Sequence, residues 1–272
     1  MLSMILLYLP LGALSGIIAG LLGIGGGVIV VPILVFTLHQ TGVITTGEEQ
    51  IMHLALGTSF ATIVITSISS ALAHNRRGAV IWPIVRALSP GMVGGVVLGA
   101  FLAANLRSAY LQGFFVCYLL YISYKLLRVS HTMNCRTLPG RGGLLGAGGV
   151  IGFVSSLVGI GGGTLVTPFL LWCNTPMHKV VGTSSAIGLP IALTGAVMYL
   201  IIGWNQPGLP PYCLGYVYLP AFLGIAVASF CTAPIGSAIS HRLPVGILRK
   251  LFAGLLLLIA VRMGWMLLAP IL

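Results

Sequence analysis

Two stretches of the chain decide the fold: GLLGIGGGVIVVPIL (residues 20–34) and SLVGIGGGTLVTPFL (residues 156–170). Both place GIGGG inside a hydrophobic segment, with a proline seven residues after the first glycine of the triplet. The triplets begin at Gly25 and Gly161, which gives an offset of 161 − 25 = 136, and the two prolines keep the same offset. The chain therefore carries a repeated unit whose centre is a run of glycines.

The composition predicts an all-α integral membrane protein. The 272 residues are 58% hydrophobic and only 6% charged, and the mean hydropathy is +1.10. These values lie far outside the range of soluble globular domains. The apolar windows reach the roughly 20 residues that a helix needs to cross about 30 Å of hydrocarbon. A membrane β-barrel would instead alternate apolar and polar residues over segments of about 10 residues, and the sequence lacks that pattern.

The charges narrow the range of functions. The sequence contains thirteen Lys and Arg residues but only two acidic residues, Glu48 and Glu49, so the formal net charge is +11. The basic residues lie mostly at segment ends, where they anchor helices to the cytoplasmic face, so we expect a lipid bilayer and no nucleic acid as partner. Carriers of cations and proton relays commonly use intramembrane carboxylates, which this sequence lacks. The five cysteines form no C-x-x-C pair and have no histidine at metal spacing, so we expect no metal and no cofactor.

A second motif extends the repeat. HLALGTS begins at residue 53 and HKVVGTS at residue 178, an offset of 178 − 53 = 125, and the difference of 11 is one longer loop in the first copy. We predict a first repeat over 1–128, a basic cytoplasmic linker over 129–142 and a second repeat over 143–272. Each repeat is expected to consist of a glycine-tipped hairpin and three transmembrane helices: hairpin 3–38 with helices 52–73, 81–104 and 109–127, then hairpin 143–173 with helices 179–202, 214–238 and 246–270.

The basic residues also orient the loops. They cluster at 74–86, 125–141 and 242–250, which should be cytoplasmic, whereas the loops 39–51 and 203–213 carry no Lys or Arg and should lie outside. The first helix after each hairpin then crosses the membrane in opposite directions in the two copies. The sequence thus predicts two repeats of inverted topology.

The same orientation makes 143–173 start and end on one side of the membrane. As one straight helix these residues would extend about 46 Å, too long for one crossing and too short for two. A re-entrant or broken hairpin fits, with the glycines at its tip. We expect the two tips to meet at mid-membrane and to be open to water.

The glycines have a functional and a purely structural interpretation. Irregular backbone at membrane depth is tolerated only where it is buried in protein or lines a wet cavity, and a half-helix that restarts there offers N–H groups to an anion. Close helix packing through small residues is the structural alternative. No strand precedes the glycines and no P-loop lysine follows them, so a nucleotide site is excluded. The candidate substrate-binding glycines are Gly25, Gly26, Gly27, Gly161, Gly162 and Gly163, and Thr164 is expected to cap the second half-helix.

The GTS motifs add hydroxyl donors near helix starts. Such donors can hold a desolvated oxyanion, or each can bond back to its own helix. The candidates are Thr58, Ser59, Thr183 and Ser184. His53 and His178 are expected near the water-facing ends of their helices, as gating or proton-sensitive residues or simply as interfacial histidines.

These patterns resemble a known family. Two half-repeats, each with GIGGG-x4-P in its hairpin and followed by a GTS helix, are similar to the TauE/SafE family of sulfite-exporter-like membrane proteins over essentially the whole chain. That resemblance implies transport of sulfur-containing anions such as sulfite, thiosulfate and organosulfonates, typically export across the bacterial inner membrane. The acidic loop with Glu48 and Glu49 is not explained by it.

The sequence therefore predicts a secondary transporter of a small oxyanion, with alternating access around a central site between the two repeats and no enzymatic activity. An anion channel is one alternative. An intramembrane serine hydrolase that uses Ser70 and His74 is another, although no acid partner supports it. The anion, the direction and coupling of transport, and the oligomeric state, including a homodimer, are left open.

Overall fold

The computed structural model describes residues 2–23, 25–40, 50–128, 138–240 and 245–268, and within them it is almost entirely helical. The predicted all-α class is confirmed. The acidic loop with Glu48 and Glu49 and the linker residues 129–137 lie outside the described residues. The helices are α1 (Leu2–Leu22), α2 (Gly27–Gln40), α3 (Ile51–Asn75), α4 (Trp82–Ala104), α5 (Ser108–Arg128), α6 (Arg141–Val158), α7 (Gly163–Trp172), α8 (Met177–Gly203), α9 (Leu219–Ser240) and α10 (Val245–Leu268).

Six of the described helices are long and apolar enough to cross a membrane: α1, α3, α4, α6, α8 and α9. The protein is thus a multi-pass membrane protein. In contrast, α2 has 14 residues and α7 has 10, so they extend about 21 Å and 15 Å and cannot cross 30 Å of hydrocarbon. They are the short second arms of two hairpins, α1–α2 and α6–α7, and each hairpin breaks at GIGGG.

One predicted helix starts later than expected. The sequence places a helix over 214–238, but α9 begins at Leu219, because the preceding residues form a two-stranded antiparallel ribbon, β1 (Cys213–Leu214) with β2 (Val217–Tyr218). Gly215 turns the ribbon with φ +54°, a left-handed conformation that a continuing helix does not permit. The ribbon packs on α3 at one end of the bundle.

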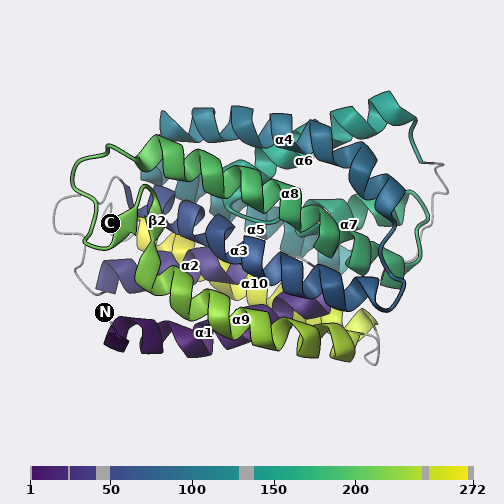
Figure 1. The fold of residues 1–272 in the computed structure, drawn as a ribbon, viewed down its shortest axis with the longest axis horizontal. Coiled ribbons are helices and arrows are strands. Elements are labelled where there is room, and N and C mark those ends of the chain that lie inside the picture. The colour runs from purple at the N-terminus through teal and green to yellow at the C-terminus, as the bar shows by residue number, and fades with distance from the viewer. Residues whose placement is uncertain (1, 24, 41–49, 129–137, 241–244, 269–272) are drawn as a thin grey trace.

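The helices lie along a common direction, and the two halves of the chain are interlocked (Figure 1). At the centre α3 packs against α8 and runs antiparallel to it: Ser70 near the end of α3 bonds to Ser185 near the start of α8. Around this pair, α1 packs along α9, and α6 packs along α4. The first helix of each hairpin is therefore held by a helix from the other half.

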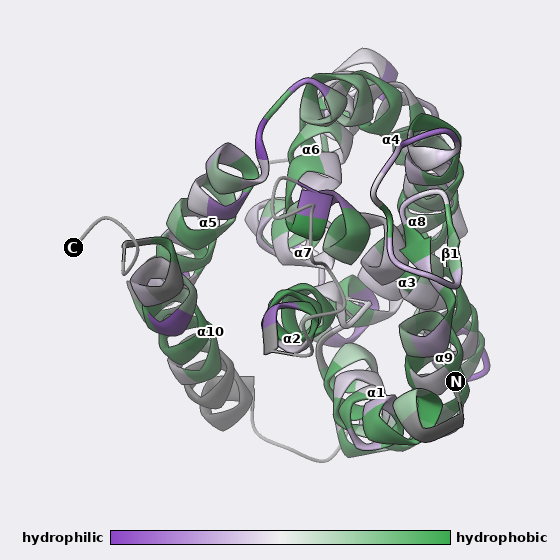
Figure 2. Ribbon diagram, turned by 90° about the vertical axis from the view of Figure 1, so that its left-hand side faces the viewer, coloured by the Kyte–Doolittle hydropathy of each residue, from purple (hydrophilic) through white to green (hydrophobic). Residues whose placement is uncertain are grey.

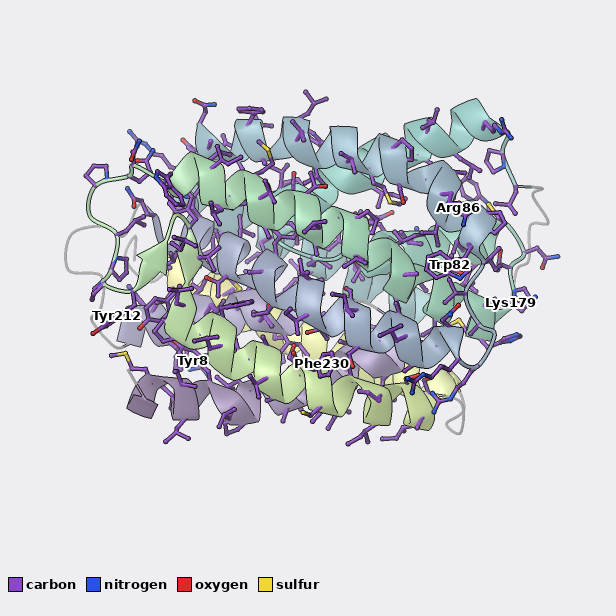
Figure 3. The ribbon with its side chains drawn as sticks, viewed as in Figure 1. Tyr8, Trp82, Arg86, Lys179, Tyr212 and Phe230 are labelled. Atoms are coloured by element: carbon purple, nitrogen blue, oxygen red, sulfur yellow. The ribbon has the colours of Figure 1, made fainter. Side chains whose placement is uncertain are left out.

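Viewed down the helix axes, α2 and α7 lie inside a ring of the other helices, with α5 and α10 forming one side of the ring (Figure 2). The ends of the bundle differ in charge. Arg86 and Lys179 lie with Trp82 at one end, and Tyr8 and Tyr212 lie at the other (Figure 3). The glycine breaks, where α2 and α7 begin, thus lie in the protein interior.

Candidate functional site

The two glycine breaks touch each other. A Cβ placed on Gly25 would lie 3.7 Å from the Cα of Gly161, and a Cβ on Gly27 would collide with the carbonyl oxygen of Gly159. The tips meet, as the sequence predicts. The expectation that they are open to water is wrong for this conformation, because all six triplet glycines are buried and the Ile63 side chain of α3 packs over the first tip.

The two breaks share two left-handed glycines at matched positions, and the first break has a third, Gly25, with φ +79°. Gly23 and Gly159 have φ of +68° and +71°, and Gly26 and Gly162 have φ of +80° and +73°. Residues with a Cβ rarely adopt this conformation, so the first member of each pair ends one helix and the second starts the next. Gly23 and Gly159, the outer glycines of the same GIGGG motifs, were not among the residues predicted from the sequence.

The start of α7 is open toward its neighbours. Gly162 is the N-cap of α7 and has no side chain to occupy the first N–H groups of the helix. The prediction that Thr164 caps this helix is therefore wrong: the threonine is the second helical residue, and its hydroxyl bonds to the hydroxyl of Tyr118 on α5. The helix keeps both its free N–H groups and its positive dipole end.

The Gly-Thr pairs of the GTS motifs hold the halves of the chain together. The Thr58 Oγ1 accepts a hydrogen bond from the N–H of Tyr218 at 2.9 Å, and the Thr183 Oγ1 accepts one from the N–H of Ile81 at 3.0 Å. Tyr218 directly precedes α9 and Ile81 directly precedes α4. Each threonine oxygen is thus bonded to the loop that precedes a helix of the opposite half.

The serines of the two motifs differ in their partners. Ser59 donates to the carbonyl oxygen of Gly159 in the second break, at 2.8 Å, and both groups are buried. Ser184 shares a hydrogen bond of 3.3 Å with Thr167 on α7. Ser59 therefore fixes the shape of a tip, whereas Ser184 contacts another hydroxyl beside α7.

The two histidines occupy different environments. His178, the second residue of α8, is exposed. His53 is buried, bonds through Nε2 to the Ala103 carbonyl oxygen at 2.9 Å, and stacks on Tyr216. The prediction of a water-facing His53 is wrong, because the β-ribbon covers the start of α3.

The proposed hydrolytic pair is used for packing between helices. Ser70 Oγ donates to Ser185 Oγ at 3.1 Å, and His74 Nε2 lies 3.1 Å from the Gly20 carbonyl oxygen near the first break. Tyr199 makes the matching contact in the other half, where its hydroxyl donates to the Ser156 carbonyl oxygen at 2.9 Å. His74 and Tyr199 therefore play the same structural part in the two halves.

Three residues near the breaks were not predicted as site residues from the sequence. Ser67 and Ser155 are 0% and 2% exposed, and within the described part of the chain the Oγ of each lacks a hydrogen-bond partner. Tyr118, on α5, contacts the start of α7. The only signal in the sequence was the presence of a hydroxyl inside an otherwise apolar helix, which by itself does not separate a site from back-bonding.

The charges lie away from the breaks. The sequences of α2, α3 and α7 contain no Asp, Glu, Lys or Arg. Any ligand at the meeting point of the tips would therefore be contacted by neutral hydroxyls, backbone N–H groups and helix dipole ends. Backbone N–H groups at a helix start and hydroxyl donors suit an oxyanion.

Comparison with known proteins identifies the family of this chain. The profile of the family described as "Sulfite exporter TauE/SafE" matches residues 8–263. The chain belongs to the TauE/SafE family. A "Probable membrane transporter protein" of Haemophilus influenzae is 38% identical over 265 residues, which cover 97% of this chain and 99% of the relative. No solved structure matches the chain significantly.

More distant TauE/SafE relatives have the same description. A probable membrane transporter protein of Methanocaldococcus jannaschii is 28% identical, with 92% of this chain and 93% of the relative covered. The Bacillus subtilis protein YdhB, also named a probable membrane transporter, is 28% identical, with 90% and 96% covered. Family and relatives alike indicate a membrane transporter.

Proposed function

We propose that this TauE/SafE protein is a secondary transporter that exports a small sulfur-containing oxyanion such as sulfite, thiosulfate or an organosulfonate. The observation that carries the proposal is the meeting of two half-helix breaks in the protein interior, next to buried hydroxyls and away from acidic side chains. Sulfur oxyanions are the substrate class suggested by the family's description.

The proposed mechanism is alternating access around this central point. It treats the two halves as inverted repeats that rock against each other, as in other transporters with broken helices. The proposal is supported by the antiparallel packing of α3 on α8 and by the exchange of α1 and α6 between the halves. The matched contacts of Thr58 and Thr183 agree with it, since each closes one end of the bundle.

Counterflow in proteoliposomes tests the proposal and separates a carrier from a channel. Vesicles that contain the purified protein are loaded with unlabelled sulfite or sulfoacetate and diluted into a trace of the labelled anion. A carrier exchanges the two and accumulates label transiently, whereas a channel dissipates the gradient without accumulation. Protein-free vesicles are the control. Correctly inserted protein that moves neither anion would contradict the proposal.

A ligand screen by thermal unfolding complements the flux assay. Any anion that binds only the folded protein raises its stability, by about 2.7 kcal/mol at 100 times Kd. We expect stabilisation by at least one sulfur oxyanion and none by alkali cations. Stabilisation by carboxylates alone would contradict the substrate class while leaving the transport mechanism in place.

A further inference from the structure

The two glycine breaks share a pair of left-handed glycines but differ in the side chains around them. Positions related by the repeat offsets pair Ser155 with Ala19 and Thr164 with Val28. On the helices beside them, the offset of 125 pairs Ser67 with Ala192. LRSAYLQGFF (106–115) resembles LPVGILRKLF (243–252) at an offset of 243 − 106 = 137, which pairs Tyr118 with Leu255. In each pair the residue with a hydroxyl lies near the break between α6 and α7, and its counterpart is apolar.

Two hydroxyls near the first break donate hydrogen bonds to backbone carbonyl oxygens. Ser15 donates to the Gly26 carbonyl oxygen at 3.4 Å, and Ser185, which lies near Gly23, donates to the Val181 carbonyl oxygen at 3.0 Å. Both bonds end on the backbone of the protein. These two hydroxyls are therefore satisfied without a ligand.

The second break is flanked by hydroxyls that lack a partner. Ser155 Oγ lies 3.6 Å from the place of a Cβ on Gly162, the N-cap of α7. Ser67 Oγ lies where the two breaks meet, 3.6 Å from the place of a Cβ on Gly25 and 2.8 Å from the place of a Cβ on Gly188. The Cβ place on Gly188 is in turn 3.3 Å from the Gly161 carbonyl oxygen. An unsatisfied buried hydroxyl is costly, so two of them beside one helix start point to an acceptor that belongs there.

The Tyr118–Thr164 pair adds a third donor. Each of two bonded hydroxyls carries one proton, and only one of those protons lies between the two oxygens. The second proton remains available to a ligand at the start of α7. Together with the N–H groups of the first turn, these donors are all neutral.

We infer that the break between α6 and α7 is the one anion site, that Ser67 and Ser155 determine its affinity, and that it takes a singly charged oxyanion in preference to a doubly charged one. The inference rests on the proposed function. A monoanion can be desolvated against neutral donors and a helix dipole, whereas a dianion without a cationic partner retains a much larger desolvation cost. Sulfonates and hydrogensulfite are the matching class.

Direct binding measurements on the purified protein test the two serines. Ser67→Ala and Ser155→Ala should each weaken the affinity for methanesulfonate about tenfold, as expected for one hydrogen bond to a charged group. The matched positions of the chain are Ala192 and Ala19, so alanine is compatible with this backbone. Ser15→Ala, at the first break, is the matched control and should bind like the wild type.

The choice between mono- and dianions is tested with the wild type. Sulfate should bind at least tenfold more weakly than methanesulfonate. The affinity for sulfite should rise as falling pH converts it to hydrogensulfite, while that for methanesulfonate, a monoanion throughout, stays constant.

The outcomes separate this inference from the proposed function. If the wild type binds sulfur oxyanions and both serine variants bind equally well, or if sulfate is preferred, the inference is overturned and the transporter proposal stands. If the wild type binds none of them, the proposed function fails. Should an alanine variant fail to insert, Ser155→Cys, which is nearly isosteric and a weak donor, makes the same test.

Discussion

The loops that precede α4 and α9 meet the same packing requirement with different structures. On one side a tight turn brings Ala79 and Ile81 against the start of α8; on the other a β-ribbon brings Tyr216 and Tyr218 against the start of α3. In both, a helix glycine, Gly57 or Gly182, lets a loop carbonyl oxygen approach closely. The threonine that follows it accepts a hydrogen bond from a loop N–H group. The backbone contacts are duplicated, whereas the side chains around them are not.

Contacts present in both halves and side chains present in only one half are expected to have different roles. Duplicated contacts hold the interlocked fold, so their loss should affect stability in both halves. Side chains that are present in only one half, such as Ser67, Ser155 and Tyr118, contribute nothing that the other half needs for folding. They are the ones expected to act on a ligand.

The largest loss of stability is expected when a side chain is added to Gly57 or Gly182, the glycines that contact the loop carbonyl oxygens. A Cβ on Gly57 would collide with the Tyr216 carbonyl oxygen, and one on Gly182 would lie 2.6 Å from the Ala79 carbonyl oxygen. We expect Gly57→Ala and Gly182→Ala to destabilise the fold by about 1–3 kcal/mol each, because the neighbour is backbone that cannot rotate away. Thermal unfolding in detergent measures this.

Gly94→Ala is the matched control for these variants, since a Cβ on Gly94 of α4 meets no atom within 4 Å. It should unfold at or above the wild-type temperature, because alanine is the better helix former. If Gly57→Ala were as stable as Gly94→Ala, the loop contact would not be the reason for the glycine.

Removing the threonine acceptors should have the next largest effect. Thr58→Val and Thr183→Val each leave a loop N–H without its partner, at a cost of about 1–3 kcal/mol. Thr58→Val should be the more damaging, because its hydrogen bond is fully buried and that of Thr183 is only partly buried. The corresponding serine variants keep the acceptor and should unfold within about 1 kcal/mol of the wild type. Equal losses for Val and Ser would contradict this account.

The smallest expected effect is a pH dependence of stability that arises only at the β-ribbon end of the bundle. Burial, with smaller contributions from Tyr8 and Cys213, raises the pKa of Tyr218 from 10.0 to about 12. The folded protein therefore keeps a proton that the unfolded chain loses, and the stability from this group is lost as pH rises from 10 toward 12. The opposite loop has Ile81 at the matched place and lacks this dependence.

Unfolding temperatures of the wild type and Tyr218→Phe across this pH window test that prediction. The wild type should lose more stability than the phenylalanine variant, and the two should run parallel below pH 10. Parallel curves over the whole window would show that Tyr218 does not ionise on unfolding there.

Much of the architecture could be predicted from the sequence. The length of the apolar windows predicted the helices, and the repeated GIGGG predicted the breaks in both hairpins, because only glycine tolerates the left-handed conformation found at Gly26 and Gly162. The β-ribbon was not predicted. Its strands are two residues each, too short for an alternating pattern to be distinguished from the start of α9.

Only part of the candidate site could be predicted from the sequence. The glycines could be named, but Thr58 and Thr183 turned out to bond loop N–H groups, and His53 turned out to be covered by the ribbon. Ser67 and Ser155 could not be singled out, because many other hydroxyls in these helices bond to carbonyls of their own turn. Whether a hydroxyl is satisfied depends on which helix faces it.

The sequence by itself determined that the chain is a duplicated, helical membrane protein of the TauE/SafE family with two glycine breaks, since hydropathy, repeats and motifs are properties of the chain. The tertiary structure decided how the halves exchange helices, that the two breaks touch, and which hydroxyls remain without a partner beside α7. Those features depend on contacts between residues far apart in the chain, such as Ser59 with Gly159, a hundred positions away, and no local pattern encodes such pairs.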